Sequence, residues 1–305
     1  MNAIANALRA GRTRAVCAIA VGCLLTATQS AHAAALIYGY VHAEKRLVSF
    51  FSDAPDDLVG DVALLGLGAS EFLAGLDFRP ATGALYAVAI DGDLFRLLTI
   101  DTATGLVTQV GTPQSRPFGA PLGVDFDPVA DSLSVVGGND EIYGIDPDTG
   151  VAVLAGGLTY GTAESPSIAH IAYTNSIAGA TTTVLYGIDW VLESTAVSST
   201  WPPNMGFLTT LGPLGRGLLG TGGFDIEPGT NAAYVALQRD VNLSSLYTLD
   251  LATGQATEVG FIGGGRLLGI AIAPEPGAFA SALFAITLVW ILRSGRSFPA
   301  RGKRA

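Results

Sequence analysis

Acidic residues outnumber Lys and Arg by 26 to 16 in this chain of 305 residues, and charged residues make up only 14% of it. The eight Lys and Arg between Ala34 and Leu292 stand against all 26 acids, and the resulting net charge of −18 excludes nucleic acid and anionic lipid as favoured partners. With 39 glycines and so few charges, the composition favours short strands and turns over charged helices.

Residues 1–33 have the three parts of a cleavable secretory signal peptide. Arginines come first, then an apolar segment, then a small-residue cleavage site with Ala31 and Ala33. The apolar segment is too short for a bilayer span, which needs about 20 residues. Both cysteines, Cys17 and Cys23, lie in this leader, so the exported chain is expected to fold without a disulfide.

One sequence pattern returns through the middle of the chain. An apolar residue and an Asp precede a Pro-containing turn, a short strand with Leu or Ala before Tyr follows, and a second strand ends in Asp before Thr-Gly. The third copy is looser than the others. The anchor positions are Gly75, Gly123, Ile171, Gly223 and Gly269, separated by 48, 48, 52 and 46 residues. A period of this size is typical of the four-stranded blades of a β-propeller.

The two ends of the repeat region complete one another. The first segment has three strand-like runs but no leading apolar strand, and these runs are Leu36–Val41, Leu47–Phe51 and Val62–Leu65. Segment Leu268–Ala273 is the missing strand alone. Joining them gives a blade shared by both termini, which removes an exposed sheet edge. We therefore predict an all-β propeller at 34–273 with five four-stranded blades, closed by N- and C-terminal strands. Six blades is the alternative, if segment 181–215 contains further strands.

Asp-x-x-Thr-Gly occurs three times at the same place in the repeat, at Asp101–Gly105, Asp146–Gly150 and Asp250–Gly254. An Asp can bond the backbone of its own turn, and Gly supplies a positive φ. We interpret these elements as hairpin turns between the two outer strands of a blade.

Three acidic residues, Asp77, Asp125 and Asp225, occupy the same place in the first strand of three repeats. One interpretation is that each caps its own Pro-containing turn. The other is that they converge on the propeller axis and hold a cation such as Ca²⁺, with Asp127 on the same strand face as Asp125. No other cofactor is indicated.

Catalytic residues are not evident. Beyond the leader only His42 and His170 remain, so metal sites built from several histidines are excluded, and a Ser-His-Asp triad would have to use one of these two. The chain has no Gly-x-Ser-x-Gly motif. We interpret His170 as a channel-facing or hydrogen-bonded residue and predict no catalytic site.

A long insertion in the third repeat contains Trp201 and Asn204. An exposed aromatic side chain on such a loop would suit stacking on a sugar ring. The alternative is that this loop is buried as a plug over its blade.

Residues 274–305 form a tail with three parts. Pro274-Glu275-Pro276 leads into an apolar run at 278–292, which we predict to be a transmembrane helix, and basic residues follow from Arg293 and Arg296. This arrangement resembles the Pro-Glu-Pro (PEP-CTERM) sorting signal of exopolysaccharide-producing Gram-negative bacteria. The resemblance implies export by the secretion translocon, transient anchoring in the inner membrane and processing by an exosortase.

The middle of the chain resembles a bacterial domain-of-unknown-function family of secreted repeat proteins (DUF4394). The likeness rests on Gly75–Tyr86, Val124–Asp131, Ala172–Asn175, Leu185–Asp189, Pro202–Gly206 and Gly223–Asp225. The chain has Asp127, Ser132 and Ser134 where the family tends to have Asn and two Arg. The resemblance implies a secreted repeat fold and no particular reaction.

These features together predict a secreted, non-catalytic propeller at the cell surface or in the extracellular matrix. Its expected role is binding or structural, in exopolysaccharide or biofilm, with polysaccharide as a partner and nucleic acid excluded. The rival hypothesis is a secreted cation-dependent hydrolase, similar to propeller lactonases, that uses a cation held by the three Asp side chains.

Overall fold

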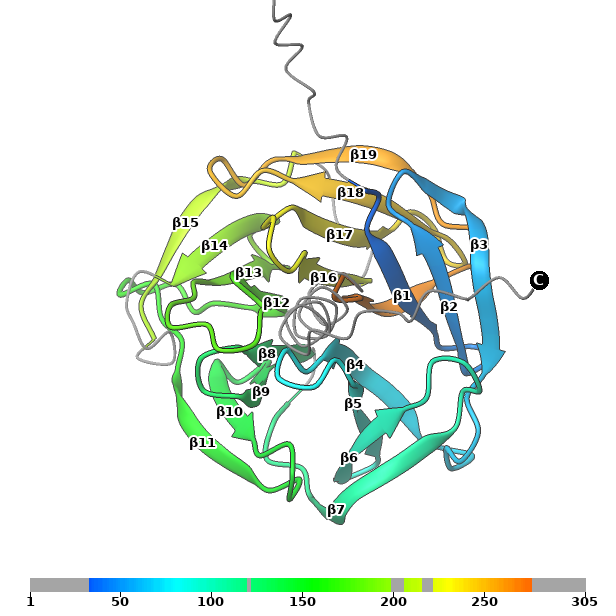
Figure 1. Cartoon of the computed structure of the whole chain (residues 1–305). Coiled ribbons are helices and arrows are strands. Elements are labelled where there is room, and N and C mark those ends of the chain that lie inside the picture. Colours follow the sequence, from blue (N-terminus) through cyan, green and yellow to red (C-terminus); the bar gives the residue numbers. More distant parts are fainter. Residues whose placement is uncertain (1–32, 120–121, 199–205, 216–221, 276–305) are drawn as a thin grey trace, which may run out of the picture. The chain divides into compact units, whose positions relative to one another are not determined.

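The computed structural model describes residues 33–119, 122–198, 206–215 and 222–275. The chain divides into two compact units, 1–33 and 34–305, and all described residues except Ala33 belong to the second. The described residues form strands and turns without a helix, and the strands are grouped in five antiparallel sheets of four (Figure 1). The predicted five-bladed propeller is therefore confirmed. The six-bladed alternative is wrong, because segment 181–215 contributes strands to one blade only.

In four of the five blades the strands follow chain order from the axis to the rim. Blade 1 comprises β4 (Phe72–Phe78), β5 (Leu85–Asp91), β6 (Leu94–Ile100) and β7 (Val107–Ser115). Blade 2 comprises β8 (Leu122–Asp127), β9 (Ser132–Gly137), β10 (Glu141–Ile145) and β11 (Ala152–Gly157). Blade 3 comprises β12 (Ile168–Tyr173), β13 (Leu185–Asp189), β14 (Ser194–Ser198) and β15 (Leu208–Pro213). Blade 4 comprises β16 (Gly223–Ile226), β17 (Ala233–Gln238), β18 (Ser244–Leu249) and β19 (Ala256–Phe261).

The fifth blade, called the closing blade, combines both ends of the described chain. It comprises β20 (Leu267–Ile272), β1 (Leu36–Val41), β2 (Arg46–Phe51) and β3 (Ala54–Ala63). β20 pairs with β1 so that Ile272 lies opposite Ile37 and Gly269 opposite Tyr40. The inner strands β4, β8, β12, β16 and β20 contact one another in cyclic order. The predicted closure by the two terminal strands is therefore confirmed.

The outer strand of the closing blade is longer than predicted. The sequence indicated a strand at Val62–Leu65, whereas β3 already begins at Ala54. Its first residues include Pro55, Asp56 and Asp57, which lack the apolar signal of a strand. Such residues suit an outermost strand, because its free edge faces water and charges there prevent pairing with another chain.

Five apolar clusters hold the ring together, one at each contact between neighbouring blades. β5 shows how one strand serves two clusters. Leu85 and Ala87 pack toward the closing blade, whereas Tyr86 and Val88 pack toward blade 2. Since alternate side chains of a strand point to opposite faces, a middle strand must be apolar at every position. This explains the continuous apolar runs of the repeat.

The Thr-Gly turns fasten the blades at the rim. In the first turn the Asp101 carboxylate accepts the N–H groups of Ala103 and Thr104, both at 2.9 Å, so the predicted turn chemistry is confirmed. Gly105 has a φ of +73°, and a Cβ there would lie 2.1 Å from the carbonyl oxygen of Ala63 in the closing blade. The glycine is thus needed for contact with the next blade as well as for its φ.

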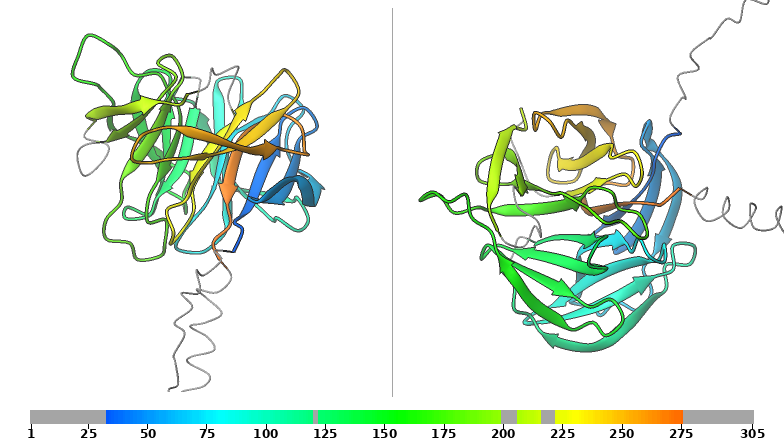
Figure 2. Two further views of the ribbon diagram at one scale, coloured as in Figure 1. Left: turned by 90° about the horizontal axis from the view of Figure 1, so that it is seen from above. Right: turned by 60° about the vertical axis from the view of Figure 1, so that its left-hand side comes forward.

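The propeller has two faces that differ in their connections. We call the face at which the inner strands end the exit face, and it carries turns such as β4–β5 and β6–β7. The inner strands begin at the opposite face, which carries turns such as β5–β6 and the links between blades. Both described ends of the propeller lie at the exit face (Figure 2). There the N–H of Ala273 donates to the carbonyl of Leu36 at 2.9 Å.

Candidate functional site

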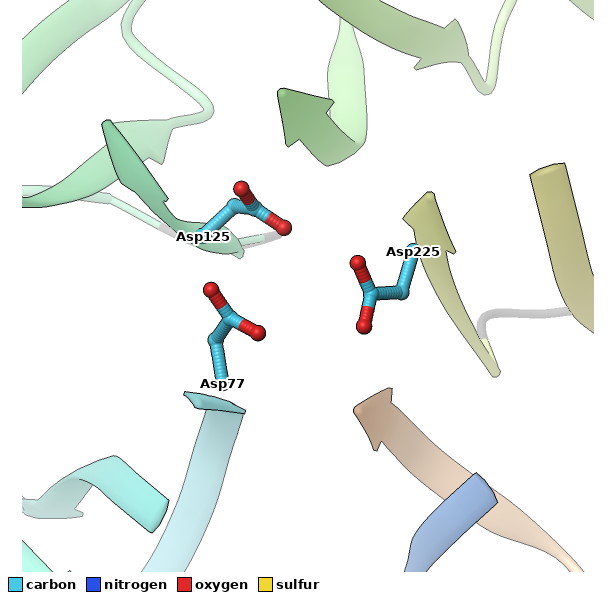
Figure 3. A group of neighbouring side chains, drawn as sticks. All are labelled: Asp77, Asp125 and Asp225. Carbon is cyan, nitrogen blue, oxygen red and sulfur yellow. The ribbon is translucent and has the colours of Figure 1, made fainter. Parts of the chain in front are cut away.

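The structure brings three of the predicted site residues together at the axis, near the exit face. Asp77, Asp125 and Asp225 come from β4, β8 and β16 and point toward one another (Figure 3). One carboxylate oxygen of each lies within 4.8 Å of those of the other two. All three side chains are buried, and Asp125 is only 1% exposed. We call these residues the axial carboxylates.

The axial carboxylates accept hydrogen bonds from the inner strands of five blades. Each of the five donors is the backbone N–H that follows the Asp position or its counterpart, and they belong to Phe78, Phe126, Tyr173, Ile226 and Ile272. Asp77 and Asp225 each accept one N–H from their own strand and one from the next blade, whereas Asp125 accepts only that of Tyr173.

Two blades have alanine where the others have Asp. Ala172 in β12 and Ala271 in β20 precede the donors Tyr173 and Ile272, as Asp125 precedes Phe126. In the blades that follow these two alanines, the N–H groups of Ile226 and Phe78 donate to the Asp of their own strand instead. Three carboxylates therefore satisfy five buried N–H groups, which would otherwise each cost about 1–3 kcal/mol. The suggestion that each Asp caps its own Pro-containing turn is thus wrong.

Burial raises the pKa of all three axial carboxyls. The pKa of Asp77 rises to about 7, mainly because burial disfavours the charged form, although the bonds from Phe126 and Phe78 oppose this. For Asp125 and Asp225 burial comes first as well, and repulsion from neighbouring carboxylates raises the pKa further. Three charges in so small a volume are unfavourable, so protons are retained there into the neutral range.

Asp127 lies outside this group. Its carboxylate accepts the N–H groups of Val129 and Ala130, at 2.9 and 3.0 Å, and so caps the Pro-containing turn that follows β8. The physical reason is its place at the last position of the strand, where a carboxylate reaches the turn more easily than the axis. Burial raises the pKa of Asp127 as well.

His170 takes the place of a glycine at the axis. The inner strands pack so closely that a Cβ on Gly123 would lie 2.8 Å from the nitrogen of Ile171. Because the donor Tyr173 is the counterpart of Phe126, the residue that matches Gly123 is His170, and the predicted anchor at Ile171 is one position late. His170 is buried, and its Nε2 accepts the N–H of Gly222 at 3.3 Å. Burial lowers its pKa to about 4, so the imidazole is neutral at pH 7.

The start of the predicted sorting signal lies beside the axial carboxylates. Pro274 lines a cavity of about 10 Å³ together with Asp77 and Asp225. This is room for about one water molecule. Several other predicted residues lie outside the described part of the chain, namely Ala31, Trp201, Asn204, Pro276, Arg293 and Arg296. The run at 278–292 lies outside the described residues too. Among the described residues no helix is long and apolar enough to cross a membrane.

The repeat identified in the sequence corresponds to a known family. Residues 46–271 match the family described as Domain of unknown function (DUF4394). The chain belongs to this family. The match begins at the first residue of β2 and ends within β20. It therefore covers almost the whole ring. No curated protein matches the sequence.

Solved structures with a similar arrangement are distant in sequence. They include a protein of unknown function from Bacteroides thetaiotaomicron (15% identity, TM-score 0.47), which covers 74% of this chain, while this chain covers 58% of it. A putative 6-phosphogluconolactonase from Bacteroides uniformis (12%, TM-score 0.42) covers 75% and is covered over 82% of its length. An engineered GH43 glycoside hydrolase (10%, TM-score 0.48) covers 74% and is covered over 51%. These similarities identify no activity for the DUF4394 chain.

Ser132 and Ser134, at which the sequence was expected to depart from the family pattern, both lie in β9. Ser134 lies opposite Asp125 in the β8–β9 pair, and its hydroxyl is 3.0 Å from that of Tyr173. Ser132 donates to the carbonyl of Ile145 at 3.3 Å. Of these two serines, only Ser134 lies opposite an axial carboxylate, because Ser132 lies opposite Asp127.

Proposed function

We propose that this DUF4394 protein is an exported propeller with a non-catalytic binding or structural role in the exopolysaccharide or biofilm of a Gram-negative bacterium. The secretion translocon exports it, the apolar run at 278–292 anchors it transiently in the inner membrane, and an exosortase processes the tail. It then resides at the cell surface or outside the cell.

The observation that carries this proposal is the position of the two chain ends. Leu36 and Ala273 are hydrogen-bonded neighbours at the exit face, so removal of a leader before the first and attachment of a tail after the second leave the ring intact. The folded part uses no cysteine, and its stability comes from the five apolar clusters. A domain of this kind suits folding after export, with a tether at one face.

Deletion of Pro274–Ala305 followed by cell fractionation tests the sorting. We expect the truncated protein to pass into the medium or periplasm without a membrane-associated stage, whereas the full chain passes through the inner-membrane fraction. Substitution of Pro274 and Pro276 by Ala, with the apolar run kept, should leave the protein in that fraction. An unchanged distribution of both variants would refute the assignment.

The second candidate, a cation-dependent hydrolase, is favoured by the convergence of the axial carboxylates alone. Ca²⁺ takes six to eight oxygen ligands, and these three carboxylates already accept five backbone hydrogen bonds. Calorimetric titration with Ca²⁺ separates the candidates. Stoichiometric binding and a higher melting temperature would support the cation site, and neither is expected for the non-catalytic propeller.

A further inference from the structure

A pocket of about 370 Å³ opens at the face opposite the chain ends, between the closing blade and blade 4. Its lining comes from three connections, namely Val41 at the end of β1 with 42–44 in the β1–β2 turn, Val241 and Asn242 in the β17–β18 turn, and Gly264–Arg266 between β19 and β20. The volume is within the range of sites for small molecules. We call it the Arg266 pocket.

Lys and Arg side chains are concentrated on the face that carries this pocket, where acidic residues such as Glu44, Asp91 and Asp93 lie as well. The connections of that face, and the strand ends beside them, hold six of the seven cations of the described residues, which are Lys45, Arg46, Arg96, Arg116, Arg239 and Arg266. The seventh, Arg79, lies at the exit face and is paired with Asp131 and Asp148. An anionic group is therefore repelled least at this face, although the whole domain is strongly acidic.

Most of these cations already have partners. Arg46 pairs with Asp61, Arg96 with Glu71 and Arg239 with Glu258. The ammonium group of Lys45 donates to the backbone carbonyls of Gly68 and Ala69. Arg266 is exposed, and among the described residues no carboxylate lies within ion-pair distance of it. Arg116 is also without such a pair, but it does not line this pocket.

The backbone that carries Arg266 is held in place on both sides. Arg46 Nη2 donates to the carbonyl of Gly264 at 3.3 Å, and the N–H of Leu267 donates to the hydroxyl of Ser244 at 3.1 Å. Gly265 has a φ of +101°, which a larger residue would adopt only with strain. A fixed backbone loses little conformational entropy when the loop binds, which favours recognition of a ligand.

The other lining groups suit a polar ring. His42 is close enough to Arg266 for that charge, after burial, to lower the pKa of the imidazole, so the ring is neutral at pH 7. Its Nδ1 lies 3.4 Å from the hydroxyl of Tyr40, so Nε2 is the nitrogen left for a ligand. Asn242 offers an amide, and Glu44 is a carboxylate that can accept hydroxyl hydrogens. Val241 is 75% exposed and supplies an apolar contact at the rim.

We propose that the Arg266 pocket binds a pyranose that carries a carboxylate, such as a uronic acid unit of an acidic polysaccharide. Arg266 receives the carboxylate through two parallel N–H bonds, for which a guanidinium is better suited than an ammonium. His42, Asn242 and Glu44 bond the ring hydroxyls. This inference rests on the proposed role in the polysaccharide matrix, and it names the class of sugar.

Calorimetric titration of the purified full-length chain with tetragalacturonate tests this, with the fully methyl-esterified tetramer as the uncharged probe. We expect the acid to bind and the ester to bind at least 10-fold more weakly. Arg266→Gln should weaken binding of the acid by about 10- to 100-fold, because it removes a charge-assisted pair of bonds. Arg116→Gln, which makes the same change of charge on the same face, should alter it less than threefold.

Three results would overturn the inference. They are no binding of tetragalacturonate, equal binding of acid and ester, and equal losses for Arg266→Gln and Arg116→Gln. Sedimentation with the producing strain's polysaccharide then distinguishes failure of the pocket assignment from failure of the proposed function. If the chain sediments with the polysaccharide and Arg266→Gln does so equally, the proposed function stands and the pocket is wrong. If the wild-type chain does not sediment, the proposed binding role fails as well.

Discussion

Asp125→Asn should stabilise the protein at neutral pH, and the axial carboxylates are the reason. The asparagine keeps an oxygen that can accept the N–H of Tyr173, the one backbone bond that Asp125 accepts. Its amide nitrogen can donate to the carboxylate of Asp77 or Asp225, as a shared proton does in the wild-type protein. The substitution therefore acts as a permanently protonated Asp125.

Repulsion between the carboxylates sets the magnitude. Two unit charges at 4.8 Å repel by about 3–4 kcal/mol at an effective dielectric constant of 20. Burial raises the pKa of Asp125 well above its usual value, and repulsion from Asp77 and Asp225 raises it further. We expect Asp125→Asn to raise the free energy of unfolding by about 2–4 kcal/mol at pH 7.5. Near pH 4.5 the gain should fall below about 1 kcal/mol.

The sign follows from proton linkage. A carboxyl whose pKa is raised in the folded state binds its proton more tightly there than in the unfolded chain. For Asp125 this stabilising contribution is complete below about pH 4, the usual range of an Asp carboxyl, and is lost as the pH rises toward the raised pKa of the folded state. The neutral asparagine does not titrate, so the advantage of the variant should grow over that window.

Urea unfolding at pH 4.5, 5.5, 6.5 and 7.5, followed by circular dichroism, measures the difference between variant and wild type at each pH. Asp93→Asn is the control, because it removes an exposed carboxylate far from the axis. A difference that stays constant from pH 4.5 to 7.5 would refute the reasoning. Destabilisation by Asp125→Asn at pH 7.5, together with loss of wild-type stability in EDTA, would instead support a bound cation.

Two further predictions concern single residues of the ring. The wild-type protein should lose about 3 kcal/mol of its free energy of unfolding as the pH falls from 6.5 to about 4, because His170 must stay neutral to remain buried. His170→Gln should remove this loss. Equal slopes of stability against pH for variant and wild type would contradict the prediction. Gly105→Ala should cost more than about 2 kcal/mol, because its Cβ would meet the carbonyl of Ala63, whereas Gly92→Ala, with a φ of +60° and no atom within 4 Å, should cost about 1 kcal/mol. Equal losses of melting temperature for the two alanines would show that the contact at the rim is unimportant.

The fold could be predicted because its cause is local and repeated. The spacing of Gly75, Gly123 and Gly223 marks a strand that must pack closely against its neighbours, and the Thr-Gly turns mark the rim. The unpaired strand before Ala273 matched the segment after Ala34 that lacked one. These signals lie in residue types, so the sequence alone reveals them.

The chemistry at the axis was less accessible. The equal positions of the three Asp side chains predicted that they could meet, but backbone amides carry no signature in the sequence. The sequence therefore does not reveal the donor groups of Tyr173 and Ile272, nor the reason for two alanines among the five positions. The third repeat was misplaced by one residue because His170 conceals the glycine anchor.

The Arg266 pocket was missed for a different reason. Its walls come from turns about 200 residues apart in the sequence, which meet only because the last blade is closed by the first strands. A lone Arg after three glycines indicates a loop and nothing more. The sequence does show that the exported part is strongly acidic, but the segregation of its cations to one face requires the direction of every strand.

That segregation bears on how a tethered propeller would present itself. Both described ends of the propeller lie at the exit face, so a tail anchored in a membrane would turn this face toward the membrane and the Arg266 pocket away from it. The exit face holds the Thr-Gly turns with their Asp residues and lies near the axial carboxylates, so it would be repelled by anionic lipid. A long acidic polymer outside the membrane would then meet first the face on which the cations lie. The topology thus links the two proposals through the way the ring is closed.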